Sequence, residues 1–360
     1  MSSSSSRNHA RKPGAIRSVL IAGGGTAGWM AAAFLAARLQ GTGVAITVLE
    51  SSAIATVGVG EATVPAIRDF FRAIGLHDFD VLRACQGTPK LGIDFLDWAG
   101  DGTRFFHPFG LYGLPSRNVP FHQYWLKLAH AGDRRPIGDY SLCTRMAHDG
   151  TFMLPVDNPV NDLAVFNWAV HFDAARFAAM LRDHALAQGV TRIDDIITHV
   201  GRDGLSGHID RIETQGGLAL TADLFLDCTG FRSLLLGQAL GVERVDWTDM
   251  LPCDRAVAMP CANGGLSTGP IPPAPRARRD GNGAFPCKTG WAMVMSMPRR
   301  ISAMTRPSPR FTPIWKARRW PSPTSSALAR GTGALSGRAI ASASALRRAS
   351  SNRWNRPPSR

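Results

Sequence analysis

A glycine-rich loop near the start of the chain has the spacing of a dinucleotide-binding motif. Residues 23–28 read Gly-Gly-Gly-Thr-Ala-Gly, which gives the pattern G-x-G-x-x-G. In such a loop Gly23 permits a tight turn, Gly25 lets the backbone approach a pyrophosphate, and Gly28 allows close packing of a helix on a strand. The chemistry predicted for this loop is therefore the binding of phosphates by backbone N–H groups.

The elements around this loop fit that prediction. The apolar run Ser18–Ala22 predicts a buried strand that leads into the loop, and an alanine-rich helix is expected from about Thr26 to Leu39. Thr26 and Ala27 would form its first turn, where unpaired N–H groups attract phosphate. A second strand is expected over Ala45–Leu49. In this context the motif indicates a dinucleotide site rather than an ordinary glycine turn.

Two acidic positions bear on which dinucleotide is bound. Glu50 ends the second expected strand, 22 residues beyond Gly28, where a carboxylate can accept hydrogen bonds from a ribose diol. Residues 222–227 predict another apolar strand that ends in Asp227, with Gly230 soon after it. A strand that returns to the first sheet and ends at the flavin favours FAD over NAD. The alternative is a core strand that a glycine turn closes.

Seven blocks of sequence resemble the flavin-dependent tryptophan halogenase family, in the family's order and over about residues 18–273. The blocks are GGGTAGWMAA (23–32), GVGEATVP (58–65), TPKLGIDFLDW (88–98), HPFG (107–110), HQYW (122–125), HFDAARFAAMLR (171–182) and DCTGFRSLL (227–235).

This resemblance implies a reaction. Reduced FAD, supplied by a separate flavin reductase, reacts with O2 and halide, and the resulting hypohalous acid travels to a lysine beside the substrate. Lys90 occupies that position, and it would either hydrogen-bond hypohalous acid or form a chloramine. The implied substrate is free tryptophan, a tryptophan-containing peptide or another electron-rich arene. Without the resemblance, Lys90 reads as a strand residue whose ammonium reaches solvent.

The resemblance also points to a second glycine loop. Gly58, Gly60, Glu61 and Thr63 suit a loop that approaches a flat ring or a halide through backbone N–H groups. The alternative is a simple turn before a helix led by Pro65. His107 and His122 could serve as acid or base groups, although structural histidines are more common.

Composition separates the body of the chain from its end. The chain has 360 residues and a net charge of +14, but 18 Lys and Arg lie in residues 274–360 beside one acid, Asp280, so that residues 1–273 carry −3. The basic segment lacks the spaced aromatics of a nucleic-acid module, so no specific nucleic acid is expected. None of the six cysteines forms a C-x-x-C pair, so neither a metal nor a disulfide framework is expected.

The amino-terminal residues and the hydropathy pattern bear on location. Residues 1–17 read as a polar, disordered leader rather than a signal peptide. No stretch of apolar residues approaches the length of a membrane span. The expected location is therefore the cytoplasm, with no membrane partner.

Residues 274–360 are rich in Arg, Ser, Pro and Ala and predict a disordered tail. The family signature W-x-W-x-I-P and a later GFVEPLE-like segment, whose glutamate partners the lysine in the family, are both absent. A frame that starts at the third base of each codon permits W-Q-W-R-V-P-L-Q-D-R-L-G-D-G-Y-V over residues 280–295 and G-F-V-E-P-L-E within residues 342–355. Two signatures in one frame and in order predict a frameshift near residues 273–276.

The predicted fold is α/β. It contains a Rossmann-like FAD-binding domain of the two-dinucleotide-fold type over residues 18–273, an interleaved substrate region around Phe70–Val170, and a basic tail over 274–360. The predicted function is that of a flavin-dependent halogenase, inactive as truncated. The alternatives are an FAD-dependent aromatic hydroxylase and a non-catalytic basic-tailed binding protein.

Overall fold

The computed structural model describes residues 14–54, 60–96, 101–156, 158–159, 161–247, 250, 253–261, 283–287 and 290–298. These residues fall into two compact units. The first unit comes from Met1–Ala55 and Arg182–Glu243, and the second from Thr56–Leu181 and Arg244–Arg360. No helix in the described ranges is long and apolar enough to cross a bilayer. Most of the predicted leader and of the predicted tail, the residues around the predicted frameshift, and Gly58 lie outside the described residues.

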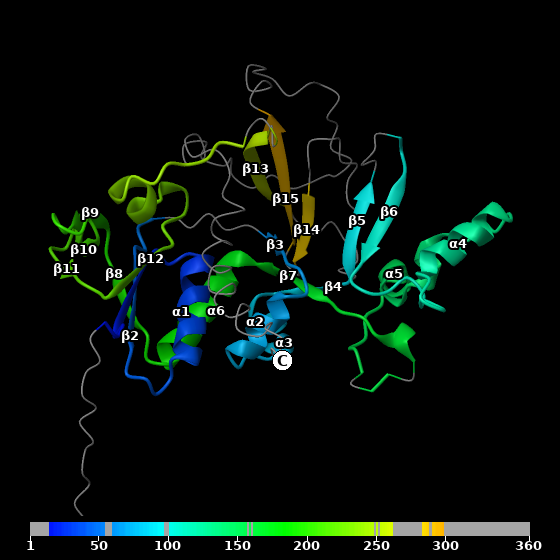
Figure 1. Ribbon diagram of the computed structural model, residues 1–360, viewed down its shortest axis with the longest axis horizontal. Coiled ribbons are helices and arrows are strands. Elements are labelled where there is room, and N and C mark those ends of the chain that lie inside the picture. The colour runs from blue at the N-terminus through cyan, green and yellow to red at the C-terminus, as the bar shows by residue number, and fades with distance from the viewer. Residues whose placement is uncertain are drawn as a thin grey trace, which may run out of the picture. The chain divides into compact units, whose positions relative to one another are not determined.

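A parallel sheet forms the centre of the first unit (Figure 1). Its strand order is β12-β1-β2-β8, and β12 pairs with β1 in parallel, with Asp227 opposite Ala22. The predicted return of the downstream strand to the first sheet is thereby confirmed. The strands are β1 (Ser18–Ala22), β2 (Ala45–Glu50), β8 (Thr191–Asp194) and β12 (Leu224–Asp227).

Both faces of this sheet are covered, which explains why its strands read as continuous apolar runs. Helix α1 (Thr26–Arg38) packs along β1 and β2 (Figure 1). On the other face Leu20 and Leu49 pack in a buried cluster with Ile212 and Leu235. That face is covered by β9 (Ile197–Arg202), β10 (Ile209–Thr214), β11 (Ala219–Leu220) and the turn of π-helix η4 (Leu234–Ala239).

The second unit contains a small antiparallel sheet of order β3-β7-β4. Phe71, Phe172 and Phe177 form part of its core, with ring centroids 5.9 Å apart between Phe71 and Phe177 and 4.3 Å apart between Phe172 and Phe177. The strands are β3 (Gly60–Ala62), β4 (Thr88–Lys90) and β7 (Ala169–Asp173), and nearby helices are α2 (Ile67–Ala73) and α3 (Asp78–Ala84).

Several further elements of this unit lie between β4 and β7 in the chain. They are the hairpin β5 (Gly92–Leu96) and β6 (Arg104–Pro108), α4 (Phe121–His130), the 3-10 turn η1 (Ile137–Tyr140), α5 (Leu142–His148) and the 3-10 turn η2 (Asp162–Ala164). Helix α6 (Ala174–Ala187) follows β7, and the chain passes from the second unit to the first within it.

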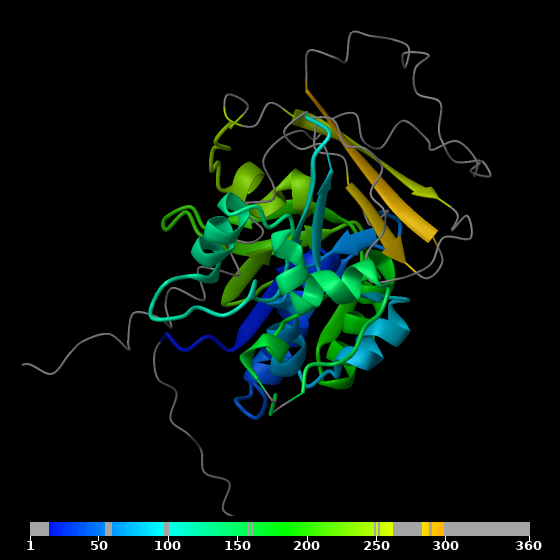
Figure 2. The same ribbon diagram turned by 90° about the vertical axis from the view of Figure 1, so that its right-hand side faces the viewer.

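A further sheet of the second unit departs from the sequence-based prediction. Strands β13 (Cys253–Cys261), β15 (Gly290–Pro298) and β14 (Gly283–Cys287) lie side by side and antiparallel in Figures 1 and 2. Two of them fall in the segment that was expected to lack structure from residue 274 onward. Average composition concealed the local run Trp291–Met297, in which apolar residues dominate a length typical of a strand.

Candidate functional site

The glycine loop is held between the ends of three strands. Gly23 donates its N–H to the Leu49 carbonyl at 2.8 Å, and the Cys228 N–H donates to the Ala22 carbonyl at 2.8 Å. Gly23 has a φ of +106°, and a Cβ there would overlap the Cys228 carbonyl. Only glycine fits this turn without strain.

The next glycines are constrained by space. A Cβ on Gly28 would overlap the Gly23 carbonyl. Glycine at this position therefore allows α1 to pack closely against the backbone of the loop that precedes it. A Cβ on Gly24 would overlap the carboxylate of Glu50. Sequence reasoning assigned no role to Gly24, because the spacing motif does not specify that position.

Helix α1 starts in a way that suits an anion. Gly25 is its N-cap residue and supplies no side-chain cap, and no acid lies in the first turn that Thr26 and Ala27 open. The first N–H groups of a helix have no partner within it, and together with the helix dipole they favour negative charge. This end of α1 can therefore receive a phosphate without displacing a side chain.

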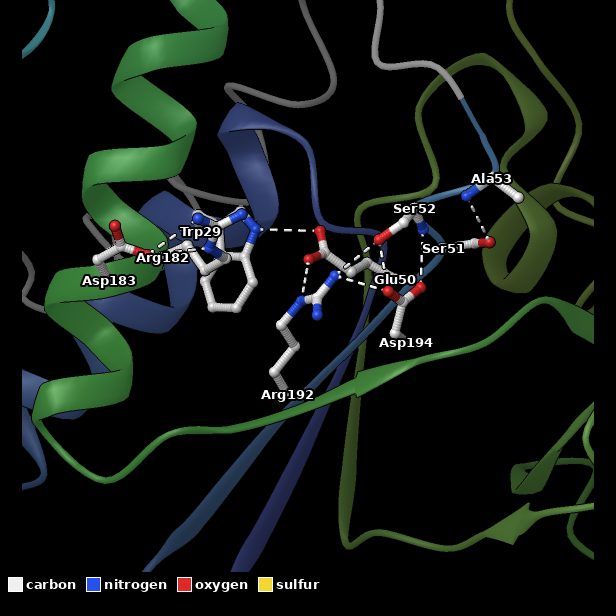
Figure 3. Close-up of polar contacts among 9 residues, drawn as sticks. All are labelled: Trp29, Glu50, Ser51, Ser52, Ala53, Arg182, Asp183, Arg192 and Asp194. Carbon is white, nitrogen blue, oxygen red and sulfur yellow. Dashed lines mark hydrogen bonds and ion pairs between the residues drawn. The ribbon is translucent and has the colours of Figure 1, made fainter.

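Glu50 lies at the end of β2, as predicted, and is held by two partners (Figure 3). Its Oε2 accepts from the Trp29 indole N–H at 3.1 Å, and its Oε1 accepts from Arg192 Nε at 2.5 Å. Arg192 also donates from Nη2 to Ser52 Oγ and to Asp194 Oδ2, both at 2.9 Å. The sequence did not indicate Arg192, because its contact with Glu50 depends on the pairing of β2 with β8.

Asp227 organises the loop at the end of β12. Its Oδ1 accepts from the Thr229 N–H and hydroxyl, and its Oδ2 accepts from the N–H groups of Leu235 and Leu236. Gly230 in this loop has a φ of +65°, which glycine adopts without cost. The carboxylate is occupied by its own loop, so its effect on a cofactor would come through the shape of that loop.

These features fit the diphosphate and adenosine ends of FAD. The loop packs so closely on itself, on Cys228 and on Glu50 that it admits only glycine at positions 23, 24 and 28. The first turn of α1 carries no side-chain cap and no competing acid. Glu50 is a carboxylate at the strand end where the fold places a ribose. The residues of the first unit that would hold this group are Gly23, Gly25, Thr26, Ala27, Gly28 and Glu50.

Lys90 lies inside the second unit. The residue ends β4 and is 6% exposed. The alternative in which its ammonium reaches solvent is therefore wrong. Nζ donates to the Thr63 carbonyl at 2.9 Å and lies 5.4 Å from the centre of the Phe109 ring. Burial lowers the pKa of Lys90 from 10.5 to about 8, because the charged form loses hydration.

Thr63 connects the second glycine loop to this lysine. Its hydroxyl donates to the Val170 carbonyl at 2.8 Å and accepts from the Val170 N–H at 3.0 Å. Gly60 and Glu61 lie in β3 and pair with β7, where Glu61 is exposed. The loop and Lys90 are thus attached to the same strand.

The histidines differ in environment. His171 in β7 is 5% exposed, and burial together with the charge of Lys90 lowers its pKa to about 3. It is neutral at physiological pH. His107 in β6 and His122 in α4 are both exposed. No group of three metal-ligating side chains occurs among the residues that the structure describes.

Comparison with known proteins decides the family. The family model described as tryptophan halogenase matches residues 18–305. This chain belongs to the tryptophan halogenase family. The match extends past residue 273, where the sequence motifs ended, and includes β14 and β15.

Individual halogenases support the assignment. The chain is 34% identical to the tryptophan 7-halogenase RebH of Lentzea aerocolonigenes over 316 residues, which are 83% of this chain and 57% of that protein. It is 38% identical over 262 residues to the tryptophan 6-halogenase ThaL of Streptomyces albogriseolus, with coverage of 68% and 48%. The structure of BrvH, a flavin-dependent halogenase from Brevundimonas sp. BAL3, superposes with a TM-score of 0.74 at 44% identity, over 79% of this chain and 57% of that one. The chain thus spans about half the length of the curated relatives it matches.

Proposed function

We propose that this chain carries the FAD-binding unit and the halogen-delivering lysine of a flavin-dependent halogenase that acts on tryptophan or another electron-rich arene. The observation that carries the proposal is the buried ammonium of Lys90, which is held at the Thr63 carbonyl in a chain of this family. The relatives are named as halogenases, so the hydroxylase alternative is not favoured.

In this proposal the first unit binds the cofactor. The N–H groups at the start of α1 hold the pyrophosphate, and Glu50 accepts from the ribose diol of the adenosine. FAD, reduced by a separate flavin reductase, supplies together with O2 and halide the oxidised halogen that the lysine receives. Gly60 and Glu61 in β3, and Thr63 just after it, are proposed for the flavin ring. Asp227 and Gly230 shape the loop at the end of β12.

Lys90 would then accept the halogen. With a pKa of about 8, it is partly a neutral amine near physiological pH. The amine attacks the halogen of hypohalous acid, so that an N–X bond forms, the O–X bond breaks and water leaves. The ammonium form can instead donate a hydrogen bond to the hypohalous acid and hold it in place. His171 stays neutral and adds no second positive charge.

The reaction also needs a carboxylate partner that acts as a base and takes up the proton lost from the ring. We propose that this partner is the glutamate encoded in the shifted frame within residues 342–355. The polypeptide of 360 residues is therefore expected to show no halogenation. A gene restored to the second frame near codon 274 is expected to recover it.

The test supplies each protein with a flavin reductase, O2, chloride or bromide, and tryptophan or a panel of indoles, and detects products by mass spectrometry. The repaired protein should halogenate an arene, and Lys90→Ala in that background should eliminate the product. Lys127→Ala, which changes an exposed lysine of α4, is the matched control and should leave activity intact. Product from the unrepaired chain, or full activity of repaired Lys90→Ala, would contradict the proposal.

A further inference from the structure

The ion pair between Arg192 and Glu50 joins two neighbouring strands at the candidate ribose site (Figure 3). Arg192 Nε reaches Glu50 Oε1 at 2.5 Å, while Nη2 reaches Asp194 Oδ2 at 2.9 Å. One guanidinium therefore lies between two carboxylates. Ser52 closes the group, because its hydroxyl accepts from Arg192 and donates to Asp194.

Burial distinguishes this pair from ordinary surface pairs. The Glu50 side chain is 14% exposed and that of Arg192 is 28% exposed. Arg211 on β10 also contacts two acids, Asp210 and Glu213, but its side chain is 43% exposed. Solvent and salt screen the Arg211 pair more strongly, so the Arg192 pair has the larger effect on the geometry of its partner.

The hydrogen-bonding capacity of Glu50 is half used. A carboxylate offers about four acceptor positions, two on each oxygen. In the described part of the chain, the Trp29 indole N–H takes one position on Oε2 and Arg192 Nε takes one on Oε1. One position remains on each oxygen, which is the number that the two hydroxyls of a vicinal diol require.

We propose that Arg192 is a specificity-determining residue, which fixes the Glu50 carboxylate so that its two remaining positions meet the adenosine ribose diol and thereby makes the site select FAD over FMN. This inference rests on the proposed function of the first unit as an FAD site. FMN has no adenosine, so it gains nothing from an oriented Glu50. Arg192 acts through Glu50 and is a positioning residue.

The experiment measures binding to the full chain of 360 residues by flavin fluorescence. FAD and FMN are titrated into the wild type, Arg192→Ala, Arg192→Lys and the control Arg211→Ala. ADP and 2′-deoxy-ADP are then titrated as competitors of FAD, because they differ only in one hydroxyl of the diol. Thermal unfolding without ligand is recorded for each variant, to identify any general loss of structure.

For Arg192→Ala the Kd of FAD should rise about tenfold, as expected for loss of a well-oriented hydrogen bond to a charged group. The Kd of FMN should stay within about twofold, and the preference for ADP over 2′-deoxy-ADP should disappear. Arg192→Lys should recover part of that preference, since it keeps the charge but not the planar fork. Arg211→Ala should match the wild type in every titration.

Two results would overturn the inference. If Arg192→Ala weakens the binding of FAD and of FMN equally, the arginine merely supports the fold. If the variant keeps the preference for ADP over 2′-deoxy-ADP, Arg192 does not orient Glu50 toward the diol. The proposed FAD site itself fails only if the wild type binds neither FAD nor ADP, an outcome that would remove the inference with it.

Discussion

The two units prepare their candidate sites in opposite ways. In the first unit the candidate phosphate site consists of the backbone N–H groups at the start of α1, on a loop whose tight packing requires glycine at Gly24 and Gly28. In the second unit the site consists of one charged side chain, Lys90, that the fold has buried. A site made of backbone costs little stability, whereas a buried ammonium costs hydration.

This difference suits the tasks proposed for the two units. Binding of an anion requires N–H groups that already point outward, and α1 provides them without reorganisation. Formation of an N–X bond requires an amine that gives up its proton near neutral pH, and burial lowers the pKa of Lys90 to about 8. We therefore expect added side-chain volume to change the stability and FAD affinity of the first unit. We expect the stability of the second unit to depend on pH.

The largest effect is expected from Gly28→Ala. Alanine in place of a helical glycine normally stabilises a helix by about 1 kcal/mol. Here the added Cβ would overlap the Gly23 carbonyl, which is backbone and cannot rotate away. The variant should lose about 3 kcal/mol or more of unfolding free energy and its FAD affinity. Gly204→Ala, at a turn where a Cβ meets open space, is the control for denaturant unfolding. Equal stability of the two variants would show that the loop is not tightly packed.

The pH dependence of Lys90→Met tests the second unit. The folded pKa of about 8 lies below the ordinary 10.5, so the charged form destabilises the fold. This penalty is fully present below pH 8, declines as pH rises from about 8 to 10.5, and is absent above that range. Lys90→Met should therefore be more stable than the wild type at pH 7, by at most roughly 3 kcal/mol, and the difference should shrink by pH 10.

The control for this series is Lys127→Met on exposed α4, unfolded by denaturant at both pH values. It should show no comparable change. A Lys90→Met variant that is less stable than the wild type at pH 7 would mean that the hydrogen bond to Thr63 outweighs the loss of hydration.

A smaller effect is expected at Thr63. Thr63→Val keeps the shape of the side chain but removes the two hydrogen bonds to Val170, at a cost of about 1–2 kcal/mol in unfolding free energy. It should also loosen the carbonyl that holds Lys90 and shift the pH at which that lysine titrates. Thr63→Ser retains the hydroxyl and should remain close to the wild type. NMR titration of the Lys90 ammonium checks both variants. If Lys90 titrates identically in Thr63→Val and in the wild type, the Thr63 hydroxyl does not influence the lysine.

The sequence predicted the first unit better than the second. Glycine spacing, apolar runs and a terminal acid are local signals, and they located β1, α1, β2 and the return of β12. The contact of Glu50 with Arg192 joins residues 142 positions apart, so it depended on a strand register that no local pattern contains. For Lys90 only the family resemblance indicated a role, and its burial was found in the structure. The strands β14 and β15 were missed because the composition of the whole segment outweighed the apolar run Trp291–Met297.

The most direct test of the account is an FAD titration of the full chain of 360 residues and of Gly25→Val. The wild type should bind FAD and shift its visible spectrum, even without halogenase activity, because every residue proposed for the diphosphate and ribose lies in the first unit. Gly25→Val should abolish that binding, since a β-branched side chain at the N-cap of α1 would occupy the approach of the pyrophosphate to the backbone. Unchanged FAD affinity in Gly25→Val would contradict the assignment of this loop as the cofactor site.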